Sequence, residues 1–179
     1  VANESLFALM YERHRMRRWR IGEEAQLAGF TREHVHGFYR TYYRGSKIVV
    51  SVVGDVETDQ VLELVEQYYG GLDAGAVPRD RGPDEPEQHA LRYRRMAGDI
   101  TSAYLEWGWP TQGILHPDAA ALDVLAITLG QGRASRLYQA VRDAGHAQSV
   151  DAQHYTPDAI GLFNLSIETT PERAASALT

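Results

Sequence analysis

Seven histidines are the side chains of this sequence best suited to bind a metal ion or to move a proton. Zinc sites on helices commonly pair histidines four residues apart, and neither HxxxH nor HxxEH occurs in the chain. His34 and His36 stand two residues apart in an expected helix, so their side chains point about 200° apart. We therefore expect surface or half-buried histidines and no metal ligand among them. The seven are His14, His34, His36, His89, His116, His146 and His154.

Motifs for nucleophilic catalysis and phosphate binding are weak or absent. The chain has no cysteine, which excludes disulfides, CxxC zinc sites and thiol catalysis, and it has no GxSxG motif. The run Gly130–Ser135 resembles a phosphate-binding loop, but it follows an expected helix and lacks the last glycine. We interpret it as a tight turn between two helices, with Ser135 capping the second. The carboxylate pairs Glu23–Glu24 and Glu85/Glu87 lie in connecting segments and are expected to be solvated, so no catalytic residue is predicted.

The composition excludes several classes of protein. Of the 179 residues, 44% are hydrophobic and 23% are charged, which predicts a chain with a buried core and excludes wholesale disorder. The net charge of −6 argues against a partner that is a nucleic acid. No run approaches 18 apolar residues, so no membrane span is expected. The absence of cysteine leaves the compartment open between the cytoplasm and the periplasm of a bacterium.

The elements that must position these residues begin with a helical region. Apolar residues recur at helical spacing over Glu4–Arg13, after the expected N-cap Thr31, and from about Thr58. Lys47–Val53 is rich in β-branched residues, which predicts a buried strand. The apolar face of the middle helix is formed by Val35, Phe38, Tyr39, Tyr42 and Tyr43.

The second half of the chain mixes strands with helices. Residues 73–88 contain three prolines and mixed charge, which is typical of a linker. A helix-start pattern also stands at Thr170–Glu172. Because the strands and helices do not alternate strictly, we predict an α+β fold with a mixed or antiparallel sheet packed against helices. The expected strands are residues 90–95, 100–109, 147–155 and 160–168, and the expected helices are residues 116–130 and 135–143.

Taken in order, several stretches of the chain resemble the M16 peptidases, the family of insulinase, pitrilysin and the mitochondrial processing peptidase. Each stretch is weak alone, but the ordered set is fairly specific and covers nearly the whole chain. The stretches are Ile21–Glu24, Leu27, Phe30–Glu33, Phe38–Tyr43, Val52–Val56, Leu64–Leu72, Gly108–Pro110, His116–Asp118, Leu122, Val124–Ala126 and Leu129–Gln139.

The resemblance implies a domain organisation. Residues 1–72 would be the C-terminal part of a first M16-like domain, residues 73–88 a linker, and residues 89–179 the N-terminal part of a second domain without zinc. In the family, the zinc ligands belong to an HxxEH motif and a later glutamate of the first domain. Neither is present here, and the resemblance places both upstream of this chain. His116 and Asp118 are therefore not expected to be ligands.

The function implied by the resemblance is that of the non-catalytic portion of a zinc-dependent metalloendopeptidase that cleaves peptides or small proteins. Zn²⁺ is then expected in the parent protein and not in this chain, which is predicted to be inactive alone. The implied partners are a peptide substrate and a second M16-like subunit or a second copy.

Two alternatives stay open. The chain could instead belong to a non-catalytic partner or scaffold subunit of an M16 heterodimer, or to a structural assembly protein resembling the core subunits of respiratory complexes. In partner subunits of the family, an Arg–Tyr pair helps to hold the substrate. Here Arg142 is present, but Gln148 or Ser149 stands where the tyrosine is expected. The resemblance therefore favours a parent that carries its own zinc.

Overall fold

The computed structural model describes residues 2–79 and 82–178 and divides into two compact units. Val1–Arg20 and Pro83–Thr179 form one unit, which we call the sheet unit because it contains the strands. Ile21–Gly82 forms the other, which we call the helical unit. Helices and an antiparallel sheet together confirm the predicted α+β class.

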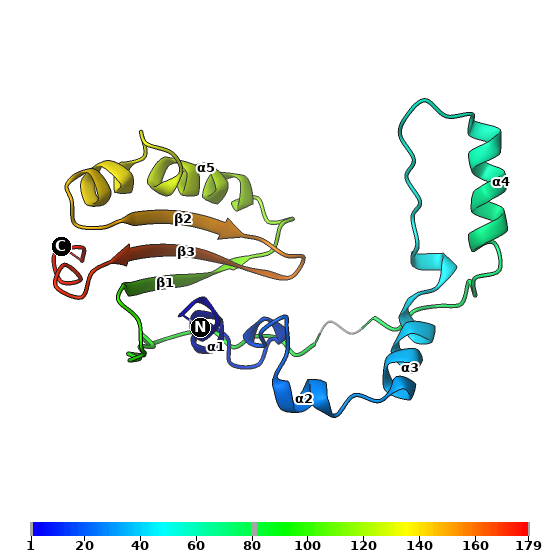
Figure 1. Cartoon of the computed structure of the whole chain (residues 1–179), viewed down its shortest axis with the longest axis horizontal. Helices are drawn as coiled ribbons and strands as arrows, with labels where there is room; N and C mark the ends of the chain where they lie inside the picture. Colours follow the sequence, from blue (N-terminus) through cyan, green and yellow to red (C-terminus); the bar gives the residue numbers. More distant parts are fainter. Residues whose placement is uncertain (1, 80–81, 179) are drawn as a thin grey trace. The chain divides into compact units, whose positions relative to one another are not determined.

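The sheet has three antiparallel strands, β1 (Ala103–Gln112), β2 (Ser149–Tyr155) and β3 (Ile160–Thr169). Their order is β1-β3-β2, so β3 is the central strand (Figure 1). These strands confirm three of the four predicted in the second half of the chain, with ends shifted by a few residues. Since neighbouring side chains of a strand point to opposite faces, Leu162 and Phe163 of β3 belong to different cores.

One face of the sheet packs against α5 (Ala119–Gly130) and the short π-helix η3 (Tyr138–Asp143). Phe163 and Ala152 pack with Ala126 of α5, while Val150 and Ile167 pack with the side chains around η3. Gly130 ends α5 directly above β2, where an added Cβ would lie 2.1 Å from the backbone nitrogen of Ala152. A glycine is therefore required for this close approach.

The opposite face packs against α1 (Ala2–Met10). Leu6 and Met10 of α1 form a buried cluster with Tyr11 and Leu162. The Tyr11 side chain is buried, and its hydroxyl donates a hydrogen bond of 2.8 Å to the carbonyl oxygen of Gly161. Burial also raises the pKa of Tyr11 well above its ordinary value. A short 3₁₀ helix, η1 (Arg15–Arg17), follows α1 in the arginine-rich segment.

The helical unit contains α2 (Glu24–Ala28), α3 (Arg32–Tyr42), the 3₁₀ turn η2 (Gly45–Lys47) and α4 (Thr58–Tyr69). The predicted cap of α3 is confirmed, because the Thr31 hydroxyl accepts the N–H of His34 and the His34 ring accepts the N–H of Thr31. The apolar faces predicted for these helices are exposed within the unit, as the exposed fractions of Phe38 (58%) and Tyr68 (71%) show.

Two predicted strands and one predicted helix start are corrected by the structure. Residues 48–53 and 90–95 have no regular secondary structure, and Val49 and Val53 are 92% and 95% exposed. A strand needs a hydrogen-bonded neighbour. Neither segment has one among the described residues. Thr170–Glu172 leads into a series of turns instead of a helix. Both strand predictions were therefore wrong, because a high strand propensity does not by itself form a strand.

The compact units follow spatial contact, whereas the predicted division at residues 72 and 88 follows family domains, so the latter stays a prediction. None of the helices in the described part of the chain is long and apolar enough to cross a membrane.

Candidate functional site

The structure distributes the histidines over both units and uses several of them to satisfy the backbone. His14 Nδ1 accepts the N–H of Met16 at 3.3 Å, and His116 Nδ1 accepts the N–H of Asp118 at 3.2 Å. Within residues 2–79 and 82–178, no three His, Asp or Glu side chains are grouped so that they could hold a metal ion. The expected exposure is wrong for His14, which is 5% exposed, and for the side chain of His154, which is 1% exposed.

Residues 130–135 form the predicted turn between α5 and η3, but the side chain of Ser135 does not cap the second helix. Gly132 has φ +82°, the left-handed conformation that favours glycine. The hydroxyl of Ser135 is buried and has no hydrogen-bond partner among the described residues. The backbone carbonyl of Ser135 accepts the N–H of Gln139 instead. The prediction of a side-chain cap at Ser135 was therefore wrong, because its hydroxyl accepts no backbone N–H.

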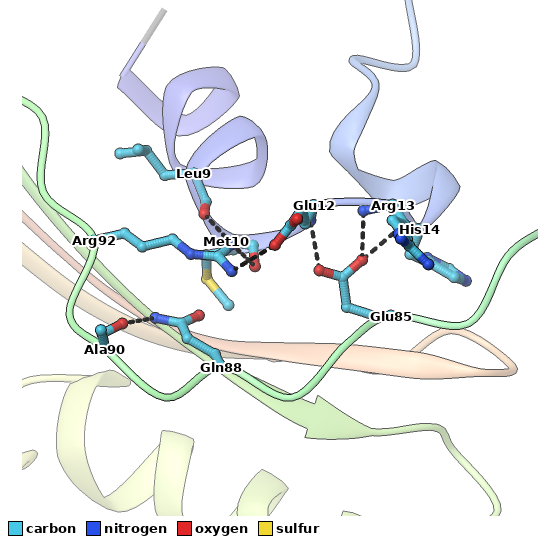
Figure 2. A network of polar contacts seen from close by, with 9 residues as sticks. All are labelled: Leu9, Met10, Glu12, Arg13, His14, Glu85, Gln88, Ala90 and Arg92. Atoms are coloured by element: carbon cyan, nitrogen blue, oxygen red, sulfur yellow. Dashed lines mark hydrogen bonds and ion pairs between the residues drawn. The ribbon is translucent and has the colours of Figure 1, made fainter.

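Glu85 is a bound carboxylate and not the solvated one that the sequence predicted (Figure 2). Its two carboxylate oxygens accept the backbone N–H groups of Glu12, Arg13 and His14, the last two at 2.8 and 2.7 Å. Burial alone would raise the pKa of Glu85, but the three N–H donors more than offset it and hold this pKa below its ordinary value. Glu87, its neighbour in the predicted pair, is exposed.

Arg92 completes the same network on the other side of the α1 terminus (Figure 2). Its guanidinium donates to the carbonyl oxygens of Leu9 and Met10 at 2.9 and 3.2 Å, and it forms an ion pair with Glu12 at 3.3 Å. The last carbonyls of a helix have no partner within the helix, so this arginine supplies one. Residues 85–92 therefore bind the C-terminal end of α1 within the sheet unit.

A second polar arrangement crosses the sheet on the side of α5. His154 of β2 places Nδ1 at 2.8 Å from Oδ1 of Asp123 on α5, and Nε2 at 3.2 Å from Oγ1 of Thr111 on β1. Although β3 separates β2 from β1, the imidazole can reach across it because Gly161 has no side chain. An added Cβ at Gly161 would lie 2.6 Å from Thr111 Oγ1.

The carboxylate of Asp123 determines which nitrogen of a neutral His154 carries the proton. A carboxylate of Asp123 accepts hydrogen bonds and does not donate them, so Nδ1 of a neutral His154 carries the proton. Nε2 is then an acceptor, and the hydroxyl of Thr111 donates to it. Both lone pairs of Thr111 Oγ1 thus remain available to accept a hydrogen bond from another group.

Thr111 also lines an apolar pocket of about 530 Å³ between α5 and the sheet. The walls come from α5, from β1 and β3, and from the segment that leads into α5. Polar groups are few, and the lining contains no lysine or arginine. Pockets of this size with sparse, fixed polar groups are typical ligand sites. The lining residues are Trp109, Pro110, Thr111, Gln112, His116, Asp118, Ala119, Leu122, Leu125, Leu129, Phe163 and Leu165.

Two further residues of interest lie apart from this pocket. Burial, and then the negative charge of Asp151, raise the pKa of Glu106 to about 7, and one of its carboxylate oxygens is buried without a partner among the described residues. Arg142 lies with its guanidinium 4.7 Å from the ring centre of Tyr138, one helical turn earlier.

The sequence did not predict the group of Thr111, Asp123 and His154. The three residues come from β1, α5 and β2, and no short motif links them because the sheet register and the packing of α5 on the sheet bring them together. Strand alternation gave no signal for Thr111, because the predicted strand ended at Trp109, whereas β1 continues to Gln112.

Comparison with known proteins gives a consistent result. A family profile described as "Peptidase M16 inactive domain" matches residues 29–179. The chain is 30% identical over 140 residues to the zinc protease PqqE of Helicobacter pylori, covering 75% of this chain and 31% of that protein. It is 27% identical over 183 residues to a zinc protease of Mycobacterium tuberculosis, covering 98% of this chain and 41% of that protein. The chain thus spans well under half the length of these relatives.

Solved structures are similar as well. The crystal structure of a protease from Helicobacter pylori matches with a TM-score of 0.87 at 25% identity, covering 97% of this chain and 43% of that one. A peptidase M16 inactive domain from Pseudomonas fluorescens matches with a TM-score of 0.79 at 21% identity, covering 96% of this chain and 42% of that one. The latter likeness concerns the fold alone.

Proposed function

The chain belongs to the M16 peptidase family and contains its inactive domain, and from this premise we propose that it is the non-catalytic part of a longer zinc-dependent metalloendopeptidase. The single observation that carries the proposal is the match of the inactive-domain profile over residues 29–179. The bacterial relatives, which are named zinc proteases, support a peptidase as the parent. Its substrates would be peptides or small proteins.

Residues 2–79 and 82–178 do not fit a catalytic zinc ion. Such an ion requires three converging protein ligands, and the described residues contain no such group. The ligands and the glutamate that activates water would then come from an HxxEH motif outside this chain. We further propose that residues 1–72 are the C-terminal part of a first M16-like domain, residues 73–88 a linker and residues 89–179 the N-terminal part of the second domain. The inactive-domain profile begins before this boundary, at residue 29.

The proposal is tested by the gene sequence upstream of the codon for Val1 and by activity of the longer protein. We expect an HxxEH motif there, and peptide hydrolysis that is lost with a chelator and restored by zinc. A matched variant with glutamine in place of the glutamate of that motif should bind zinc and be inactive. A full-length gene without HxxEH would contradict the proposal and favour a non-catalytic partner subunit.

The proposed partners are a second M16-like subunit or a second copy of the parent. One relative of this chain, 26% identical over 133 residues, is a probable mitochondrial-processing peptidase subunit beta of Schizosaccharomyces pombe, and its name marks it as one subunit of an assembly. Light scattering of the longer protein alone, and after co-expression with a neighbouring M16-like gene, distinguishes a monomer from either assembly.

A further inference from the structure

The arginine-rich segment, residues 13–20, is a strongly basic surface in an acidic chain. It contains five arginines and no aspartate or glutamate, whereas the whole chain has a net charge of −6. All five arginines are exposed. The side chains of Arg13, Arg17, Arg18 and Arg20 form no ion pair with another described residue. These four charges are therefore available to carboxylates of another molecule.

The backbone of the arginine-rich segment is held in place, which distinguishes it from a solvated run of charges. The Glu85 carboxylate accepts the backbone N–H groups of residues 12–14 (Figure 2), and the His14 ring accepts the N–H of Met16. His14 is buried, and Met16 packs against the buried cluster of α1 and β3. The arginines are therefore presented to solvent from an ordered backbone. A surface that is ordered before it binds loses less conformational entropy on association.

The helical unit carries the opposite charge along α4. Residues 55–66 contain five aspartates and glutamates and no lysine or arginine. All five are exposed, and none forms an ion pair within the described part of the chain. Three of them, Asp59, Glu63 and Glu66, stand at positions i, i+4 and i+7 of α4 and form one row, which we call the acidic stripe. The other two are Asp55 and Glu57.

The acidic stripe is on the side of α4 opposite to the apolar residues. Successive residues of an α-helix are turned by about 100°, so the three carboxylates fall within about 60° of one another. The centre of the apolar face is turned by about 180° from them. A segment that covers the apolar face can therefore leave the acidic stripe exposed. The apolar residues are Val61, Leu64, Val65 and Tyr68.

We propose that two copies of this chain associate through these surfaces, so that the arginine-rich segment of one copy binds the acidic stripe of the other. Guanidinium groups pair with carboxylates through two parallel hydrogen bonds, and several such pairs on ordered backbones support an association that one exposed pair does not. Each copy carries both surfaces, so a two-fold arrangement forms the contact twice. The inference rests on the proposed function, in which a second copy is one proposed partner, and it names the surfaces that meet.

Sedimentation equilibrium of the full chain of 179 residues tests the association. We expect the mass to rise from monomer to dimer with protein concentration at about 50 mM NaCl, and the dimer to dissociate at about 500 mM NaCl, because salt screens exposed ion pairs. Association through the exposed apolar side chains of the helical unit would not be weakened by salt. A monomer at every concentration, or a dimer that salt does not weaken, would overturn the proposal.

Charge reversal assigns the two surfaces. The double variants R17E/R18E and E63R/E66R should each weaken self-association by about tenfold or more, because like charges then face one another. An equimolar mixture of the two variants should associate again, since both contacts between unlike copies are then complementary. R94E/R95E reverses two exposed arginines elsewhere in the sheet unit and should have no effect. An equal loss in this control, or no recovery in the mixture, would contradict the assignment.

The remaining outcomes separate this inference from its alternatives. A contact within one chain would leave the mass independent of concentration, and a chain that binds polyglutamate while staying monomeric would use the arginine-rich segment for another partner. Either result overturns the inference. The measurements require neither zinc nor hydrolysis, so a parent that lacks HxxEH would leave it standing. Conversely, an active parent whose 179-residue chain stays monomeric would overturn the inference alone.

Discussion

At the scale of single residues, the pKa of a buried carboxylate depends on its burial and on the hydrogen-bond donors that contact it. Glu85 and Glu106 have the same chemistry, but one binds three N–H groups and the other has a buried oxygen without a partner among the described residues. Burial, and then the charge of Asp151, raise the pKa of Glu106, whereas at Glu85 the three N–H donors outweigh burial and lower the pKa. The two residues should therefore give opposite dependences of stability on pH.

Glu85→Gln should destabilise the chain by about 1 kcal/mol at pH 7, because a neutral amide oxygen is a weaker acceptor than a carboxylate. Since the pKa of Glu85 is lower in the folded state, its contribution is present above the ordinary pKa of about 4.5 and is lost as the pH falls through the folded value. Urea unfolding at pH 7 and pH 3 measures both. Glu87→Gln, at an exposed position, is the control, and an equal effect there would contradict this role of Glu85.

Glu106→Gln should stabilise the chain at pH 8 by about 1–3 kcal/mol, because an ionised Glu106 is partly buried beside Asp151. The folded pKa of about 7 exceeds the ordinary value of 4.5, so stability is greatest below pH 4.5 and decreases as the pH rises to about 7. The variant should lack this decrease. Thermal unfolding between pH 4 and pH 8 tests it, and an unchanged profile would exclude Glu106 as the source.

At the scale of elements, the sheet unit depends on how closely α5 approaches the strands. The glycine at the end of α5 and the imidazole of His154 connect the helix to β2 at separate points. The first contact relies on the absence of a side chain, and the second on a pair of hydrogen bonds. Each can be removed by itself, which separates packing from polar contributions.

His154→Ala should destabilise the sheet unit by about 2–4 kcal/mol, since it leaves a buried void and takes the hydrogen-bond partner from Thr111. Denaturant unfolding followed by circular dichroism measures the change. His89→Ala, at an exposed residue of the connecting segment, should change stability by less than about 0.5 kcal/mol. Similar values for the two variants would show that the hydrogen bonds of His154 with Thr111 and Asp123 contribute nothing to stability.

Gly130→Ala should lower the stability of the sheet unit by about 1–3 kcal/mol, because its Cβ would lie 2.1 Å from the backbone nitrogen of Ala152 and neither backbone can yield easily. The readout is the midpoint of thermal unfolding. Gly98→Ala is a matched control in the same unit, since nothing lies within 4 Å of its added Cβ. A drop at position 98 as large as that at position 130 would argue against the close approach.

At the scale of the whole molecule, the chain is a member of the M16 family that spans 31% and 41% of two zinc proteases. Its helical unit leaves large apolar side chains such as Phe38 and Tyr68 exposed. Amphipathic helices are stabilised by packing of their apolar faces, which this unit does not provide alone. In the longer protein proposed above, we expect other segments to cover these faces.

The isolated chain should hold no stoichiometric zinc after dialysis, because no three His, Asp or Glu side chains of the described residues are grouped so that they could hold a metal ion. Elemental analysis by mass spectrometry measures the metal content, and the longer protein serves as the matched sample that should retain about one zinc ion. Zinc retained by the chain of 179 residues, and lost on substitution of its histidines, would contradict this prediction.

Much of the sheet unit was predictable from sequence. Strand alternation located β1 and β3, and the cap at Thr31 located the start of α3, because these signals act between residues close in the chain. The strand expected at Lys47–Val53 was wrong for a physical reason, since β-branched residues favour a strand only where another strand is available to pair with it. The solvated environment predicted for Glu85 was wrong, because the N–H groups that it binds lie about seventy residues earlier in the sequence.

What the sequence determined by itself is therefore the family, most of the helices and the three strands of the sheet, together with the absence of HxxEH and cysteine from this chain. Those properties depend on residue type and on short spacings. Tertiary structure alone decided that Glu85 binds the end of α1, and that His154 joins Asp123 to Thr111 beside an apolar pocket. The physical reason is range, because hydrogen bonds and packing form between atoms that are close in space, and here the sheet register and the folding back of residues 85–92 bring distant residues together.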